Sequence, residues 1–193
     1  MRFFDCPIPP IADTRRGRIL HTLITVFLCL CIFIDMAFIF AMSSESKTDS
    51  GDRSGEIADV VVDVVYPDFD QLSTEQQESI LQKVHKFIRK LAHFLEFAIL
   101  GWLTALLVAH LASRISAITP VFQWFSPAAF CFAYAASDEI HQIFTQRGHS
   151  VRDVLLDCVG VVCGILVARL MVWVVCLIAC RVGNRSSKGE SIA

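Results

Sequence analysis

The chain has few charged residues and no excess of basic ones. Only 19% of its 193 residues are Asp, Glu, Lys or Arg, and the formal net charge is -2. Nucleic-acid-binding domains favour a basic stripe or patch, so this balance argues against nucleic acid as a partner. Hydrophobic residues make up 54% of the chain, which exceeds the norm for soluble domains and is concentrated in long blocks. The composition therefore indicates a membrane protein.

Cysteine is absent from the main polar segment, residues 43–89, although the chain contains eight cysteines. A disulfide framework would place cysteines in exported loops, so we interpret those in the apolar runs as small buried hydrophobes. The pair Cys29 and Cys31 is too closely spaced and too apolar to predict a metal site. We therefore predict neither a bound metal nor a cofactor, and a metal-dependent enzyme stays only as an alternative below.

The charge-poor blocks are long enough to cross a membrane. At about 1.5 Å rise per residue, a helix of roughly 20 residues spans the hydrocarbon core of about 30 Å. The first block is longer than the apolar region of a signal peptide, about 7–15 residues, so we interpret it as an uncleaved span. We predict an all-α membrane protein, a bundle of four transmembrane helices, with a kink or break at Pro127. The predicted spans cover residues 19–42, 91–112, 121–137 and 154–180.

The segment 43–90 between the first two spans predicts a short extracytoplasmic insertion. Its first part is rich in Ser, Asp and Glu and is typical of a solvated linker. An amphipathic stretch then ends at Pro67, and a second one begins at Ser73. Gln76 follows three residues later, which is a capping-box pattern for a helix start. We expect two short helices that lie on the membrane surface with their apolar faces down.

Four spans place both termini on one side of the membrane. Basic residues precede the first span and follow the last, so the positive-inside rule predicts cytoplasmic tails at 1–18 and 181–193. The basic residues between Lys83 and Lys90 oppose this topology, but the first span usually sets the orientation. Within the spans, we expect Asp35 to pair or snorkel and Arg169 to snorkel toward the inner interface.

Two polar clusters lie at the mouths of the predicted spans. Charged residues there are costly unless paired or hydrated, which makes them candidates for a functional site. In the first cluster, Lys90, His93 and Glu96 recur every three residues and are neighbours on one helix face. In the second, Asp138 and Glu139 share a helix face with Gln142.

A ridge of acidic and small residues follows on the fourth predicted span. Asp153 and Asp157 continue at helical spacing into Gly160 and Gly164, a small-residue pattern that lets membrane helices approach closely. The predicted topology brings this ridge, both polar clusters and Arg147 to the outer end of the bundle. We therefore predict that they form one outward-facing site.

Three kinds of chemistry fit such a site. Arg147 and Lys90 would hold a phosphate or carboxylate group in a binding protein. Alternatively, Glu139 or Asp138 beside His93 would act as a general acid/base pair, or as metal ligands, in an enzyme that modifies an envelope lipid. The third alternative is a structural charge network that only fixes helix pairing.

Two stretches, 89–97 and 137–142, resemble the VanZ-like family of bacterial membrane proteins. They read Arg-Lys-Leu-Ala-His-Phe-Leu-Glu-Phe and Ser-Asp-Glu-Ile-His-Gln, and the resemblance covers about 38–168. Downstream, Arg147, Ser150, Asp153 and Asp157 also match. The chain departs from the family at 145–148, where it reads Thr-Gln-Arg-Gly and family members often carry Pro-Gly-Arg.

The resemblance implies an integral membrane protein of the bacterial cell envelope with a role in resistance to teicoplanin. Its partners would be the lipid bilayer and a lipid-linked cell-wall precursor or a lipoglycopeptide. We favour a non-enzymatic binding protein over an enzyme, and an enzyme over a structural network. The expected ligand-binding residues are Lys90, His93, Glu96, Asp138, Glu139, Gln142, Arg147, Ser150, Asp153 and Asp157.

Overall fold

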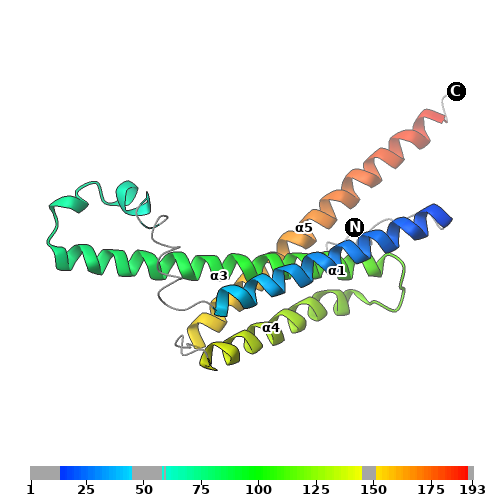
Figure 1. Cartoon of the computed structure of the whole chain (residues 1–193). Helices are drawn as coiled ribbons and strands as arrows, with labels where there is room; N and C mark the ends of the chain where they lie inside the picture. Colours follow the sequence, from blue (N-terminus) through cyan, green and yellow to red (C-terminus); the bar gives the residue numbers. More distant parts are fainter. Residues whose placement is uncertain (1–13, 45–57, 59, 145–150, 191–193) are drawn as a thin grey trace.

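The computed structural model describes residues 14–44, 58, 60–144 and 151–190. Within these ranges the chain is helical apart from short turns and contains no strand, which confirms the all-α prediction. Its elements are α1 (Arg15–Ser44), the 3-10 helix η1 (Phe69–Gln71), α3 (Thr74–Ala112), α4 (Pro120–Phe144) and α5 (Val151–Glu190) (Figure 1).

The long helices alternate in direction around α3. In Figure 1, α1 and α4 lie alongside the C-terminal half of α3, and α5 packs against it before it leaves the bundle at an angle. The first turn of α1 and the last turns of α5 lie toward the same end of the bundle. The most extensive helix pairing is that of α3 with α5.

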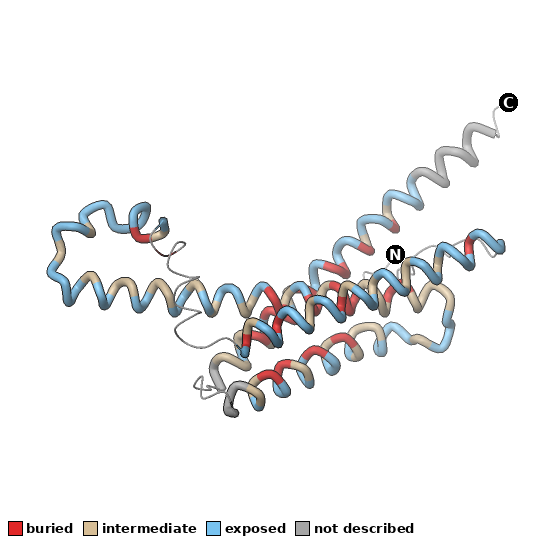
Figure 2. Tube along the Cα trace, in the orientation of Figure 1, coloured by how far each residue is buried: buried red, intermediate tan, exposed pale blue. Residues whose placement is uncertain are grey.

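The lateral surface of the bundle is apolar. Buried residues gather where the helices meet (Figure 2), and Ile39, Phe97 and Leu100 are completely buried. Phe33 and Phe125, in contrast, are 71% and 70% exposed. Soluble monomers rarely expose large continuous apolar patches. Among the described residues, α1, α3 and the part of α5 from Asp153 to Arg181 are long and apolar enough to cross a membrane. The chain is therefore a membrane protein.

α4 extends further than the predicted span 121–137, because it includes the acidic residues that follow and ends at Phe144. Pro120 occupies its first position, where proline is favoured because the missing N–H needs no helical partner. The helix passes through Pro127 without a break. α4 is not among the three candidate spans of the described chain, since Gln, Trp, Ser, Pro and Tyr residues lower its mean hydropathy.

α3 differs from the prediction. The capping box is present: the backbone N–H of Ser73 donates to Gln76 Oε1 (3.1 Å), and that of Gln76 donates to Ser73 Oγ (3.4 Å). The helix then continues for 39 residues, about 58 Å at 1.5 Å per residue. It contains no Gly or Pro before Gly101 to end it. The second expected surface helix is therefore wrong as a separate element, since it is the first half of α3.

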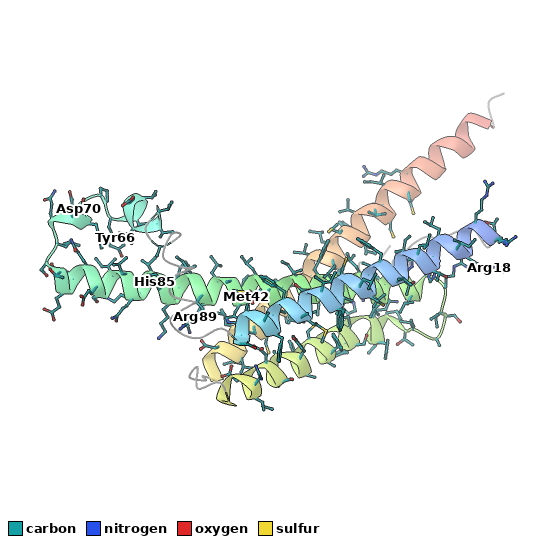
Figure 3. All side chains as sticks on the ribbon, viewed as in Figure 1. Arg18, Met42, Tyr66, Asp70, His85 and Arg89 are labelled. Carbon is teal, nitrogen blue, oxygen red and sulfur yellow. The ribbon has the colours of Figure 1, made fainter. Side chains whose placement is uncertain are left out.

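This first half of α3, residues 74–90, is called the arm. It projects beyond the other helices, and a segment carrying Tyr66 and Asp70 folds back beside it (Figure 3). The Gln77 side chain donates to the carbonyl oxygen of Phe69 at 3.0 Å and fastens that segment to the arm. A straight helix that crosses a membrane cannot also lie on its surface, so the arm would stand out from the bilayer.

The C-terminal helix also extends beyond its predicted end. α5 has 40 residues and continues to Glu190, so most of the expected tail, 181–193, is helical.

Arg169 lies in α5 and does not snorkel. It is 9% exposed, and its guanidinium donates to the side-chain oxygen of Gln123 on α4 (2.9 Å) and to the Gln123 backbone oxygen. The same group lies 5.1 Å from the ring centroid of Trp124. Our expectation for Arg169 was wrong, because Gln123 and Trp124 of α4 lie beside the guanidinium and hold it inside the bundle.

Gln123→Leu is therefore expected to be more destabilising than Arg169→Met. The first change leaves a buried charge with one acceptor fewer, which costs about 1.5–3 kcal/mol for a hydrogen bond to a charged group. The second removes the charge itself, and replacing buried ionic groups by apolar ones is often close to neutral. Unfolding of the purified variants by SDS titration measures both. A larger loss of unfolding free energy for Arg169→Met than for Gln123→Leu would contradict the assignment of Gln123 as the partner of the buried charge.

Candidate functional site

One end of the bundle gathers polar side chains from all four long helices. They lie at the C-terminal end of α1, in the middle of α3, in the last turns of α4 and in the first turns of α5. We call this set the polar cluster. It comprises Ser43, Ser44, Lys90, His93, Glu96, Asp138, Glu139, His141, Asp153 and Asp157.

Two serines connect α1 with α4. The Ser43 hydroxyl donates to Asp138 Oδ2 at 2.9 Å, with Ser43 fully buried and Asp138 4% exposed. At the neighbouring exposed position, Ser44 Oγ lies 3.1 Å from His141 Nε2. Both serines were missed because they stand where the sequence turns polar and were assigned to a linker. In the sequence, the only indication of their role is that they carry hydroxyl groups directly after an apolar run.

An accessible ion pair connects α3 with α5. Lys90 Nζ lies 2.5 Å from Asp153 Oδ1, and the two side chains are 35% and 39% exposed. Ion pairs that solvent reaches contribute only about 0–1 kcal/mol. A ligand could therefore exchange with either partner at little cost.

Further along α3, His93 lies among carboxylates. Its Nδ1 is 3.3 Å from Glu96 Oε2, a close contact that is not aligned as a hydrogen bond and becomes an ion pair when His93 is protonated. Asp157 on α5 is 6% exposed and interacts electrostatically with His93 and with Asp138. An imidazole among carboxylates can accept and return protons, which is the arrangement that acid/base chemistry requires.

Asp35 extends this charged region into the bundle. It lies on α1, is partly buried and interacts electrostatically with Glu96. Its Oδ2 atom is buried and has no hydrogen-bond partner among the described residues. Ionisable groups at this depth are costly in a membrane helix, so Asp35 joins the functional candidates.

Glycines hold the two acidic turns of α5 against α3. A Cβ atom at Gly160 would collide with the carbonyl oxygen of Phe94, and one at Gly164 with that of Ala98. The structure thus places both predicted packing residues at the α3–α5 contact. Gly101 on α3 was missed, although a Cβ there would lie 2.5 Å from the carbonyl oxygen of Val161.

The side chains of three predicted site residues are not described. Arg147 and Ser150 lie outside the described residues, and Gln142 is described as part of α4 without its side chain. Glu139 is partly exposed and interacts electrostatically with Asp157. Within the described ranges, no group of three His, Cys, Asp or Glu side chains is placed to hold a metal ion.

Comparison with protein families identifies a match that covers most of the chain. The model of the VanZ/LLP1 family matches residues 24–173, a range that includes every member of the polar cluster. No curated protein and no solved structure matches this chain. Because the match covers most of the chain, with the polar cluster inside it, this membrane protein belongs to the VanZ/LLP1 family.

Proposed function

We propose that this is a multi-pass protein of the bacterial cell membrane with four spans and both termini in the cytoplasm. α4 as a fourth span is supported by its position alongside α3 and by its exposed phenylalanines, Phe122 and Phe125. The beginning of α1 and the end of α5 lie toward one end of the bundle (Figure 1). Arg15 and Arg18 stand at that end, as the positive-inside rule favours.

In this orientation the polar cluster faces outward and binds a lipid-linked cell-wall precursor or a lipoglycopeptide. Binding of this kind contributes to resistance to teicoplanin-type antibiotics. The observation that carries the proposal is the partly exposed ion pair of Lys90 and Asp153, which lies at one end of an apolar bundle beside buried carboxylates.

Both signs of charge in the polar cluster have a role. A phosphate or carboxylate of the ligand takes the place of Asp153 on Lys90. The carboxylates of Asp138, Glu139 and Asp157 accept hydrogen bonds from the ammonium, amide or hydroxyl groups of the same ligand, since charge-assisted hydrogen bonds are the strong ones. The cluster therefore fits a head group that carries both anionic and donor groups.

Lys90→Met is expected to weaken ligand binding by about 10- to 100-fold, because a hydrogen bond to a charged group contributes about 1.5–3 kcal/mol. Methionine keeps much of the side-chain length and removes the charge. Lys83→Met removes an exposed lysine two turns earlier on α3 and is the matched control. Asp153→Asn should leave binding unchanged or strengthen it, because Lys90 then loses its internal competitor.

The measurement is a titration of the purified protein in nanodiscs. Fluorescent teicoplanin and a fluorescent lipid-linked peptidoglycan precursor are tested separately. Equal affinities for the wild type and Lys90→Met would disprove the role of this site. A misfolded Lys90→Met variant would instead favour the alternative in which the charges only fix helix pairing.

An enzyme is the second candidate, and the contact of His93 with Glu96 favours it. A membrane-embedded enzyme would use His93 as the general base on an envelope lipid, oriented by Glu96. Its metal-dependent form lacks support among the described residues. Lipid analysis of cells that carry His93→Asn tests this function, because a lost or accumulated lipid species would identify a reaction. An unchanged lipid profile leaves the binding protein as the better account.

A further inference from the structure

An apolar groove of about 450 Å³ lies between α1, α3 and α4. Its walls are almost entirely apolar and include Met36 of α1, Leu107 of α3 and Phe130 of α4. The volume lies within the range of about 300–1,000 Å³ that is typical of small-molecule sites. Because the groove is formed by segments that lie in the bilayer, its surroundings are hydrocarbon.

The groove lies directly below the polar cluster on all three helices. On each helix, the nearest groove residue is separated from a cluster residue by seven or eight positions, about 10–12 Å at 1.5 Å per residue. These pairs are Met36 and Ser43 on α1, Thr104 and Glu96 on α3, and Phe130 and Asp138 on α4. The top of the groove therefore lies at nearly the same distance below the cluster on α1, α3 and α4.

The groove offers few polar atoms to a ligand. Thr104 Oγ1 donates to the carbonyl oxygen of Leu100 at 2.8 Å, so its hydrogen-bonding need is met within its own helix. Ser126 contributes one buried hydroxyl that has no hydrogen-bond partner among the described residues. A polar group of a ligand would therefore find a single partner among walls that are otherwise apolar, whereas a hydrocarbon chain has no hydration to lose.

We propose that this groove takes the hydrocarbon chain of the ligand whose head group the polar cluster holds. The inference deepens the proposed function and rests on it: the substrate class is a lipid with one chain that enters the protein between α1, α3 and α4. Affinity then depends on both parts of the ligand: the charged head at the cluster, and the chain in the groove, which begins 10–12 Å below the nearest cluster residues and about 21 Å below Lys90.

Val108→Phe adds bulk to the groove wall and is expected to lower affinity for the chain-bearing ligand at least about tenfold, because blocked methylenes lose their apolar contacts. Ser126→Leu fills the same groove from α4 and serves if the first variant does not fold. Val121→Phe is the matched control, since Val121 is 66% exposed on α4 and does not line the groove.

The test compares two probes in nanodiscs: fluorescent teicoplanin, which carries a fatty acyl chain, and the same glycopeptide without that chain. Wild type should bind the acylated probe more tightly. Val108→Phe should remove that advantage and leave the chainless probe unaffected, whereas Lys90→Met should weaken both. Equal binding of the two probes by wild type overturns the inference and leaves the proposed function standing.

A second measurement distinguishes a failure of the proposed function from a failure of the groove as a chain site. If neither probe binds wild type, the proposed function fails. The groove is then tested by a phospholipid with a diazirine in its acyl chain, followed by mapping of the labelled residues. Labelling of the groove that Val108→Phe abolishes and Val121→Phe retains supports a chain site, and equal labelling of all three proteins refutes it.

Discussion

Gly164→Ala is expected to lower the free energy of unfolding by about 3 kcal/mol. The added methyl group would overlap the carbonyl oxygen of Ala98 on α3. Overpacking of a tight contact typically costs about 1–3 kcal/mol, and the upper end applies where the obstacle is backbone that cannot change rotamer. Gly160→Ala should behave alike, because its methyl group would meet the carbonyl oxygen of Phe94.

The matched control is Val167→Ile, three residues further along α5. It also adds one methyl group, but Val167 is 52% exposed on the apolar outer surface, so its effect should stay within about 0.5 kcal/mol. SDS titration of the purified variants gives both values. A Gly164→Ala variant as stable as Val167→Ile would show that α3 and α5 do not pack as closely as the structure has them.

The same substitution should weaken the proposed ligand binding in the fraction that remains folded. Gly160 and Gly164 hold the two helices whose earlier turns carry Lys90 and Asp153. Separating the backbones lengthens that ion pair and moves Asp157 away from His93. The position of the site thus depends on residues without side chains that lie two to three turns below it.

The sequence predicted the helical class and the apolar blocks. It also predicted the two groups of polar residues that α3 and α4 bring to the polar cluster. Each of these is a local property of the chain. Hydrophobic blocks determine which segments are helices in a membrane. The spacing of Lys90, His93 and Glu96 places them on one face whatever their neighbours are. The capping box at Ser73 was also predictable, since both of its hydrogen bonds form within four residues.

What could not be predicted depends on distant partners. Ser43 has an ordinary sequence context, and its role appears only when Asp138, 95 positions later, is packed against it. Arg169 was expected to snorkel because its partner on α4, Gln123, lies 46 positions away. The arm was misjudged for another reason: an amphipathic stripe indicates which face of a helix is apolar, but it does not show where the helix ends.

Asp138→Ala is the second change with a large expected effect, a loss of about 2–3 kcal/mol of unfolding free energy. It removes the acceptor of the buried Ser43 hydroxyl and leaves that hydroxyl without this bond in a fully buried position. A hydrogen bond to a charged group contributes about 1.5–3 kcal/mol, to which the lost packing of the side chain adds. The link between α1 and α4 in the polar cluster, about 10–12 Å above the groove, would be broken.

Asp138→Asn should cost much less, about 1 kcal/mol or below. The amide oxygen still accepts the hydrogen bond from Ser43, so the link survives. Asn also removes a negative charge that interacts unfavourably with Asp157. This gain offsets part of the stability that is lost when the hydrogen bond from Ser43 is no longer charge-assisted. The contrast between Ala and Asn separates the two roles of Asp138, because Asn keeps the helix link and removes the charge that the ligand would meet.

A double-mutant cycle of Asp138→Ala with Ser43→Ala measures the link directly. Partners in one buried hydrogen bond usually show a coupling energy of about 0.5–3 kcal/mol. Ser44→Ala is the control, since Ser44 is exposed and should stay within about 0.5 kcal/mol of wild type. Additive losses for Ser43 and Asp138 would show that α1 is held to α4 by apolar packing alone. Coupled losses, with a stable Asp138→Asn variant that binds teicoplanin more weakly than wild type, would assign Asp138 both to the fold and to the site.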